Sequence, residues 1–134
     1  MKSIHILLVE DNEGDVMLTT EVLNESNFPC TISVVRDGRE ATLLLNKKEK
    51  YAEEVMPDLV ILDLNLPKMN GIEVLKNIKT NEATRHIPVI MLSTSAFEKD
   101  IQLCHQYKAS CFMTKPMEAE VFCEQLMILK GNTV

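Results

Sequence analysis

The segment Leu59-Val60-Ile61-Leu62-Asp63 is the part of the sequence that decides the fold. Four consecutive apolar residues end at a carboxylate, with no polar residue among them. A strand with one solvated face alternates apolar and polar side chains, whereas a strand covered on both faces is apolar throughout, as in parallel sheets. Residues 59–63 are therefore predicted to form a buried strand of a parallel sheet, with Asp63 at its carboxyl end.

Comparable short runs lie on both sides of this segment. Residues 6–9 and 89–92 are equally apolar, whereas residues 32–35 are more mixed. Residues 111–114 are less apolar and are expected to form an edge strand. The sequence thus predicts five strands.

Segments with the period of an amphipathic helix alternate with these runs. The first is predicted to bury a face made of Leu18, Thr19, Val22 and Leu23. The other helices are expected to begin at Asp37-Gly38, Gly71, Glu98 and Met117. Their expected core residues are Ala41, Leu44 and Leu45; Val74, Leu75 and Ile78; Ile101 and Cys104; and Phe122, Leu126 and Leu129.

Five strand-helix units predict an α/β fold of (βα)5 type. Right-handed crossovers then produce a doubly wound, parallel five-stranded sheet with the flavodoxin-like strand order 2-1-3-4-5. A length of 134 residues fits one such domain, so residues 1–134 are expected to be a single domain with no output domain.

Composition narrows the function classes. Hydrophobic residues make up 46% of the chain and charged residues 25%, which is typical of a folded globular protein. The net charge is −6 and no long basic run occurs, so direct binding of nucleic acid is disfavoured. No apolar stretch approaches the roughly 20 residues of a membrane span and no signal peptide is found, so a cytoplasmic protein is expected.

The four cysteines lack the paired spacing of a metal-binding knuckle. They are interpreted as reduced thiols that pack as small hydrophobic residues. A zinc site would have to combine Cys104, His105, Cys111 and Cys123, and their spacing supports it only weakly.

Polar residues follow the predicted strands at their carboxyl ends. Glu10 and Asp11 follow the first strand, Asp63 ends the third, Ser93 follows the fourth, and Lys115 follows the fifth. These ends meet at one edge of a doubly wound sheet. Carboxylates brought so close together repel one another, and a hard divalent cation such as Mg²⁺ would neutralise them.

This combination of groups suits transfer of a phosphoryl group to a carboxylate. Asp63 is the best candidate nucleophile, because the central strand places it in the middle of the edge. Lys115 would supply a positive charge for an anionic group. Each carboxylate taken alone is better interpreted as a solvated residue or a cap in a strand-to-helix turn. Their joint occurrence at matched strand ends favours the functional interpretation.

At these positions the chain resembles the receiver domains of bacterial two-component response regulators. The resemblance covers nearly the whole chain. It rests on Leu8-Val9-Glu10-Asp11-Asn12, on Asp63-Leu64-Asn65-Leu66-Pro67-Lys68-Met69-Asn70-Gly71, on Ser93-Thr94-Ser95 and on Lys115-Pro116. It implies a protein that accepts a phosphoryl group from a histidine kinase and then either signals by changing its protein partners or passes the group onward in a phosphorelay, rather than a turnover enzyme.

The resemblance also implies a metal site. Asp63 is then the phospho-acceptor, and Asp11, Asp63 and the backbone carbonyl of Asn65 bind Mg²⁺, with Mn²⁺ as a substitute. Glu10 assists directly or through water.

Further roles follow from the same resemblance. Ser93 and Lys115 would contact the phosphoryl oxygens. Ser93 and Phe112 would be the switch residues, and Phe112 lacks the hydroxyl of the tyrosine often found at this position. Thr94 and Asn65 would flank access to the phosphoryl group.

A narrower resemblance concerns the partner. Residues 9–15 and 92–95 look most like the stand-alone receivers that partner bacterial phytochrome histidine kinases. Asp15 belongs to this pattern, although an acidic residue in the first turn of a helix is also favoured by the helix dipole. A downstream target or a phosphotransfer protein is expected as the second partner.

Surplus apolar residues in the last helix predict self-association. Met127, Ile128 and Met117 fall outside its expected core face, which exceeds one buried stripe. We expect a homodimer through the fourth helix, the fifth strand and the fifth helix.

Two alternatives from other classes remain. A phosphatase or phosphotransferase with an aspartate nucleophile normally carries a second aspartate two residues later, where this chain has Asn65. A flavodoxin-like electron carrier would need a phosphate-binding loop after the first strand, where Glu10 and Asp11 would repel phosphate. Aromatic residues to flank a flavin are also scarce, at 4% with no Trp.

Overall fold

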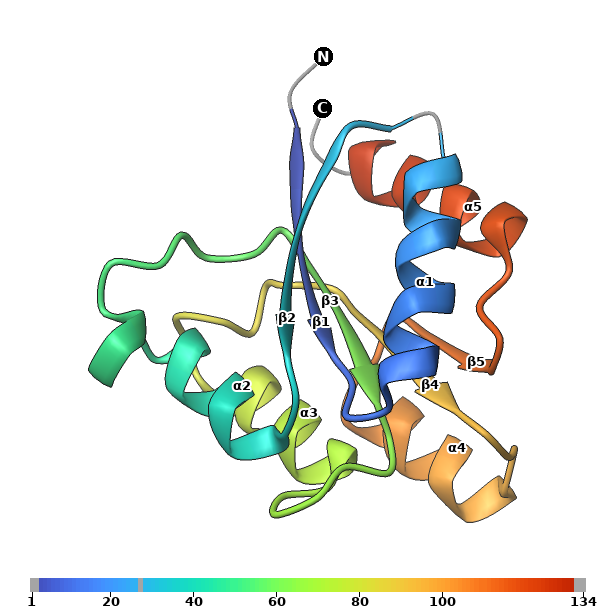
Figure 1. Ribbon diagram of the computed structural model, residues 1–134. Helices are drawn as coiled ribbons and strands as arrows, with labels where there is room; N and C mark the ends of the chain where they lie inside the picture. The colour runs from blue at the N-terminus through green and yellow to red at the C-terminus, as the bar shows by residue number, and fades with distance from the viewer. Residues whose placement is uncertain (1–2, 27, 132–134) are drawn as a thin grey trace.

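The computed structural model describes residues 3–26 and 28–131, with side chains described as far as residue 128. Strands and helices alternate along the chain as predicted (Figure 1). The strands are β1 (Ile4–Val9), β2 (Cys30–Val35), β3 (Leu59–Asp63), β4 (Val89–Ser93) and β5 (Cys111–Thr114). The helices are α1 (Glu13–Glu25), α2 (Gly38–Leu45), α3 (Gly71–Thr80), α4 (Glu98–Gln106) and α5 (Ala119–Gly131), with a short 3-10 helix η1 (Glu49–Tyr51).

The sheet confirms the predicted topology. Within the described residues, five parallel strands pair in the order β2-β1-β3-β4-β5. β3 lies at the centre, and all of its residues are buried. β5 lies at an edge, as its weaker apolar character predicted.

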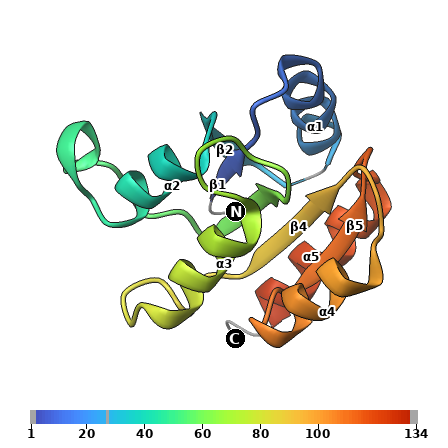
Figure 2. The ribbon, with the colours of Figure 1, turned by 90° about the horizontal axis from the view of Figure 1, so that it is seen from below.

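Helices cover both faces of the sheet, which explains the unbroken apolar runs. Val60 and Leu62 belong to a core shared with residues of α2, α3 and α4. Leu59 and Ile61 belong to a second core shared with residues of α1 and α5. Figure 2 shows α1 and α3 on opposite sides of the central strands. Because successive side chains of a strand point to opposite faces, each strand contributes to both cores.

Side-chain caps fix where three of the helices begin. The side-chain oxygens of Asn12, Asp37 and Asn70 each accept a hydrogen bond from the backbone N–H three residues later, at 2.9, 2.8 and 3.0 Å. Such caps satisfy N–H groups that have no partner inside the helix. They confirm the predicted starts of α2 and α3 and place the start of α1 just beyond the end of β1.

The predicted core face of α1 was partly wrong. Leu18 is 52% exposed, whereas Val16, Thr19 and Leu23 are buried. With the cap at Asn12, the buried residues Val16, Thr19 and Leu23 are spaced by three and then four positions. Leu18 lies outside this spacing and faces solvent. Apolar residues on both sides of a helix do not by themselves set its rotation.

Two further predictions of burial need correction. Ile101 of α4 is 38% exposed, and the described core contribution of that helix comes from Cys104. Met117 is buried and precedes α5, which begins at Ala119, so it adds nothing to the exposed apolar surface. Phe122 and Leu126 are buried as expected, whereas the side chain of Leu129 lies outside the described residues.

Cys104, Cys111 and Cys123 are free thiols. Cys104 is buried, and burial raises the pKa of its thiol to about 11, which favours an unreactive structural role. Cys30, Cys111 and Cys123 are only half-buried, less than their interpretation as core residues predicted. None of the described helices is long and apolar enough to span a membrane.

Candidate functional site

The carboxyl ends of four strands bring the predicted polar residues to one edge of the sheet. Glu10 follows β1, Asp63 ends β3, Ser93 ends β4 and Lys115 follows β5. Backbone hydrogen bonds extend the strand pairing to these ends: the N–H of Glu10 donates to the carbonyl of Val35 at 3.0 Å, and the N–H of Lys115 donates to that of Ser93 at 2.8 Å. The sheet itself therefore positions the site.

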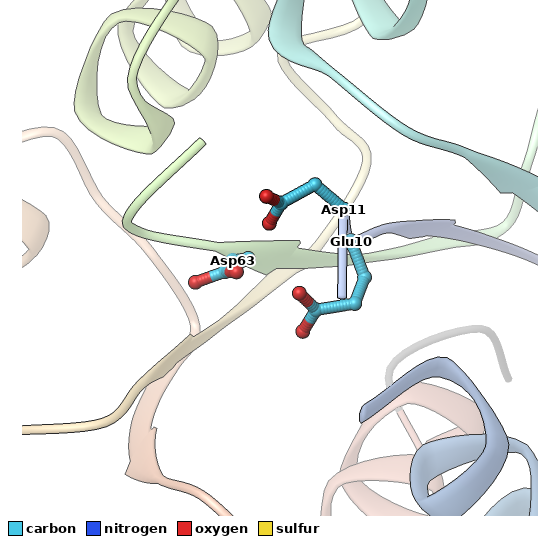
Figure 3. A group of neighbouring side chains, drawn as sticks. All are labelled: Glu10, Asp11 and Asp63. Atoms are coloured by element: carbon cyan, nitrogen blue, oxygen red, sulfur yellow. The ribbon is translucent and has the colours of Figure 1, made fainter. Parts of the chain in front are cut away.

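Three carboxylates form an acidic cluster at the centre of this edge. Among the described residues, Glu10, Asp11 and Asp63 are the group of potential metal ligands, with oxygens within 4.8 Å of one another. Figure 3 shows their carboxylates pointing toward one another. Glu10 is fully buried, Asp63 is 4% exposed and Asp11 is exposed, so the cluster opens to solvent on the Asp11 side.

Lys115 reaches into this cluster. Its Nζ lies 2.7 Å from Oε1 of Glu10, 2.9 Å from Oδ2 of Asp15 and 3.1 Å from Oδ2 of Asp63. The lysine side chain is 12% exposed, so water screens these contacts little. The ammonium is thus shared among carboxylates of the loop after β1, of α1 and of β3.

Burial and the neighbouring charged groups shift the pKa values of Glu10 and Lys115. Burial, followed by the neighbouring Asp63, raises the pKa of Glu10 from its ordinary value of 4.5 to about 7, although Lys115 acts in the opposite direction. Burial alone would lower the pKa of Lys115, but its contacts with Glu10, Asp15 and Asp63 outweigh that effect and raise it. Lys115 is therefore charged near neutral pH, and one ammonium does not neutralise the cluster.

The donor set fits a hard divalent cation. Carboxylate oxygens are the ligands that Mg²⁺ and Mn²⁺ prefer. The backbone N–H groups of Asn12 and Asn65 donate to Oε2 of Glu10 at 3.2 Å and to Oδ1 of Asp63 at 3.1 Å, which orients both carboxylates. Asn65 itself is exposed, and the role of its carbonyl as a ligand stays a prediction.

The predicted switch residues and the access residue Thr94 lie on β4 and β5 or directly after β4. Ser93 is fully buried, and its Oγ accepts a hydrogen bond from the N–H of Ser95 at 3.2 Å. Thr94 is exposed beside it. Phe112 is half-buried and packs against the core under α2, α3 and α4. It lies on β5, three residues before Lys115.

Gly71 holds the backbone of the site in place. A Cβ atom at this position would lie 2.3 Å from the carbonyl oxygen of Asp63 and 2.7 Å from Cα of Leu64. The N–H of Gly71 also donates to the carbonyl of Leu64 at 2.8 Å. The start of α3 therefore packs directly on the end of β3, and only glycine leaves room for this contact.

Asp15 is the contact residue that sequence reasoning did not place. Its expected position in the first turn of α1 is correct, but its carboxylate also pairs with Lys115. The available signal was its spacing of four residues after Asp11, in a helix that starts beside the end of β1. The identity of its partner could not be read from that spacing.

Comparison with known proteins identifies the family. The model of the response regulator receiver domain matches residues 6–127. Response regulator Rcp1 of Synechocystis sp. is 41% identical over 110 residues, which cover 82% of this chain and 75% of Rcp1. A solved Mn²⁺-bound form of Rcp1 is 36% identical with a TM-score of 0.81, covering 96% of this chain and 90% of that one.

Solved phytochrome response regulators are also similar. The phosphorylated cyanobacterial phytochrome response regulator RcpA is 41% identical with a TM-score of 0.82, covering 97% of this chain and 91% of that one. The bacteriophytochrome response regulator AtBRR is 37% identical with a TM-score of 0.85, covering 97% and 94%. The narrower resemblance to phytochrome receivers is thereby confirmed. The chain belongs to the response regulator receiver domain family and is a phosphorylation-based signalling protein.

Proposed function

We propose that Asp63 accepts a phosphoryl group from the phosphohistidine of a sensor histidine kinase. The observation that carries this proposal is the placement of Asp63: a buried carboxylate at the end of the central strand, 3.1 Å from the ammonium of Lys115 and inside an acidic cluster. A carboxylate oxygen of Asp63 attacks phosphorus, and the bond from phosphorus to the histidine nitrogen breaks. The electron pair of that bond returns to the imidazole, and an acyl phosphate forms on Asp63.

The chain's own residues stabilise the charge that moves in this step. Lys115 lies beside the nucleophile and offers an ammonium to the phosphoryl oxygens. Ser93, at the end of the neighbouring strand, offers a hydroxyl group to the same oxygens. Thr94 and Asn65 are both exposed and flank the path by which the donor and water reach Asp63.

Mg²⁺, with Mn²⁺ as a substitute, is the metal that the acidic cluster supports. Glu10, Asp11 and Asp63 would hold it together with the carbonyl of Asn65. When bound, the cation neutralises negative charge on the phosphoryl oxygens. The Mn²⁺-bound structure of the similar protein Rcp1 supports this assignment.

Phosphorylation is proposed to act through Ser93 and Phe112. A serine hydroxyl that turns toward the phosphoryl group leaves its present contact with the N–H of Ser95. Phe112 is half-buried and has no hydroxyl to anchor, so packing alone sets the balance between its inward and outward positions.

The protein is proposed to signal rather than to turn over a substrate. The alternative of an aspartate-nucleophile phosphatase is not favoured, because Asn65 stands where that class needs a carboxylic acid and because the family is a signalling family. Phosphorylation and dephosphorylation of Asp63 then change which protein is bound, or pass the phosphoryl group onward in a phosphorelay.

The proposed donor is a phytochrome histidine kinase. The similarity to RcpA and AtBRR, both described as phytochrome response regulators, supports this partner. We assign the protein to the cytoplasm, because the free thiols of Cys104, Cys111 and Cys123 fit reducing surroundings.

A homodimer through α4, β5 and α5 is proposed from exposed apolar side chains. Phe97 is 66% exposed next to α4, and Met127 and Ile128 are 67% and 57% exposed on α5. Sedimentation of the wild type and of Met127→Glu/Ile128→Glu, with and without beryllofluoride and Mg²⁺, tests it. A dimer that phosphoryl mimicry strengthens and the double substitution abolishes is expected; a wild type that stays monomeric at high micromolar concentration contradicts it.

Phosphorylation itself is tested with a matched pair of variants. Asp58 immediately precedes β3 and Asp63 ends it, so the two aspartates mark opposite ends of one strand. Asp58 accepts a hydrogen bond from the N–H of His5 at 2.9 Å, away from the acidic cluster. With acetyl phosphate and Mg²⁺, Asp63→Asn should lose labelling while Asp58→Asn keeps it. Equal labelling of both variants would contradict the assignment.

A further inference from the structure

Asp15 is not part of the acidic cluster and is not the proposed phospho-acceptor, yet its carboxylate contacts Lys115. We propose that Asp15 is a positioning residue that holds Lys115 in the resting state and competes with the phosphoryl group for its ammonium. This inference rests on the proposed function of Asp63. It assigns to Asp15 control over how readily the phosphorylated state forms.

The geometry makes Asp15 a full partner of the lysine. Nζ of Lys115 donates hydrogen bonds to Oδ2 of Asp15 at 2.9 Å and to Oδ2 of Asp63 at 3.1 Å. The side chain of Asp15 is 31% exposed, so its carboxylate is partly shielded from water. Within the described part of the chain, Lys115 is the cation with which Asp15 forms an ion pair.

Charge counting singles out Asp15 as the surplus anion. Glu10, Asp11 and Asp63 together can hold a divalent cation, whereas Asp15 stands outside that group. With the cation and Lys115 in place, the carboxylates of these four residues leave one negative charge uncompensated. A phosphoryl group adds more negative charge to the same site.

The phosphoryl group and Asp15 therefore compete for one ammonium. The two distances from Nζ place Oδ2 of Asp15 within about 6 Å of Oδ2 of Asp63, the atom beside which the new anion forms. Lys115 must leave at least part of its contact with Asp15 to reach a phosphoryl oxygen. Asp15 also repels the incoming group, so both effects oppose phosphorylation.

Glu13 provides a matched control in the same helical turn. It is acidic like Asp15, and it pairs with Arg36. Glu13→Gln removes one negative charge from the first turn of α1 while leaving the lysine contact intact. An effect specific to the lysine contact must therefore differ between Asp15→Asn and Glu13→Gln.

The test is the affinity of the full chain for beryllofluoride, a phosphoryl mimic, at saturating Mg²⁺. Asp15→Asn should bind it about tenfold more tightly than the wild type, because a neutral amide neither repels the anion nor holds the lysine as strongly. Glu13→Gln should stay within about twofold of the wild type. Asp15→Glu keeps the negative charge, so its affinity for beryllofluoride should be close to the weaker affinity of the wild type.

Two readouts separate this role from a structural one. The Mg²⁺ affinity of Asp15→Asn, measured by calorimetry without beryllofluoride, should be unchanged or weaker, so tighter anion binding cannot come from tighter metal binding. A variant that was merely destabilised would bind the anion more weakly, which overturns the proposal. If Asp15→Asn binds beryllofluoride with the same affinity as Glu13→Gln, the proposal is also overturned.

The outcomes also distinguish a failure of the role of Asp15 from a failure of phosphorylation at Asp63. A wild type that binds Mg²⁺ but no beryllofluoride contradicts phosphorylation of Asp63 and the inference together. A wild type that binds beryllofluoride, with Asp15→Asn no tighter, contradicts the role of Asp15 alone.

Discussion

Raising the pH of the metal-free protein should lower its stability through Glu10. This carboxyl group is fully buried, and its pKa is raised from 4.5 to about 7, first by burial and then by Asp63. Because the pKa is higher in the folded state, the protonated form stabilises the fold. That stability is fully present below pH 4.5 and is lost as the pH rises through about 7.

The magnitude follows from the two pKa values. A tenfold change in an acidity constant corresponds to about 1.4 kcal/mol, so protonation of Glu10 stabilises the fold by about 3 kcal/mol. About 2 kcal/mol of this should disappear between roughly pH 5 and pH 7.5. Glu10→Gln, a neutral side chain of the same shape, should remove this part of the pH dependence.

Urea unfolding in the presence of a chelator measures the effect. The free energy of unfolding is compared between wild type and Glu10→Gln across this pH range, so that other titrating groups cancel. Glu13→Gln serves as the control and should keep the wild-type decline, because Glu13 is exposed at the helix surface. A decline of the same size in Glu10→Gln, or a wild-type stability that rises with pH, would refute the reasoning.

The remaining predictions concern packing. Gly71→Ala should lower the free energy of unfolding by about 1–3 kcal/mol and weaken Mg²⁺ binding, because the new methyl group meets the carbonyl of Asp63. Urea unfolding measures the first effect and calorimetry the second, and an unchanged Mg²⁺ affinity would contradict the second. Phe122→Ala should lower the free energy of unfolding in urea by about 3–5 kcal/mol, whereas Met127→Ala on the same helix should change it by no more than about 0.5 kcal/mol, because Phe122 is buried and Met127 is exposed. Similar losses in the two variants would contradict the orientation of α5.

Much of the fold and site could be predicted because the informative patterns are local. The four apolar residues Leu59 to Leu62 are typical of a strand covered on both faces, and the carboxylate of Asp63 after them marks the functional edge of the sheet. The strand order then brings Glu10, Ser93 and Lys115 together without further information.

The parts that could not be predicted depend on rotation and on tertiary contacts. Leu18 and Ile101 fit an apolar stripe by spacing, but caps and neighbouring elements set which side of each helix faces the core. Met117 was expected in a helix and lies before it, packed in the core. The pairing of Asp15 with Lys115 joins residues 100 positions apart, and no local pattern encodes it.

The measurement that tests the central claim most directly is chemical mapping of the phosphoryl group on the unaltered protein. The chain is incubated with acetyl phosphate and Mg²⁺, the acyl phosphate is reduced with borohydride, and the modified residue is located by mass spectrometry of peptides. The modification should be found at Asp63, and chelation of Mg²⁺ before the incubation should prevent it. Modification at Asp11 or Asp15, or labelling that persists without the metal, would contradict the proposed site.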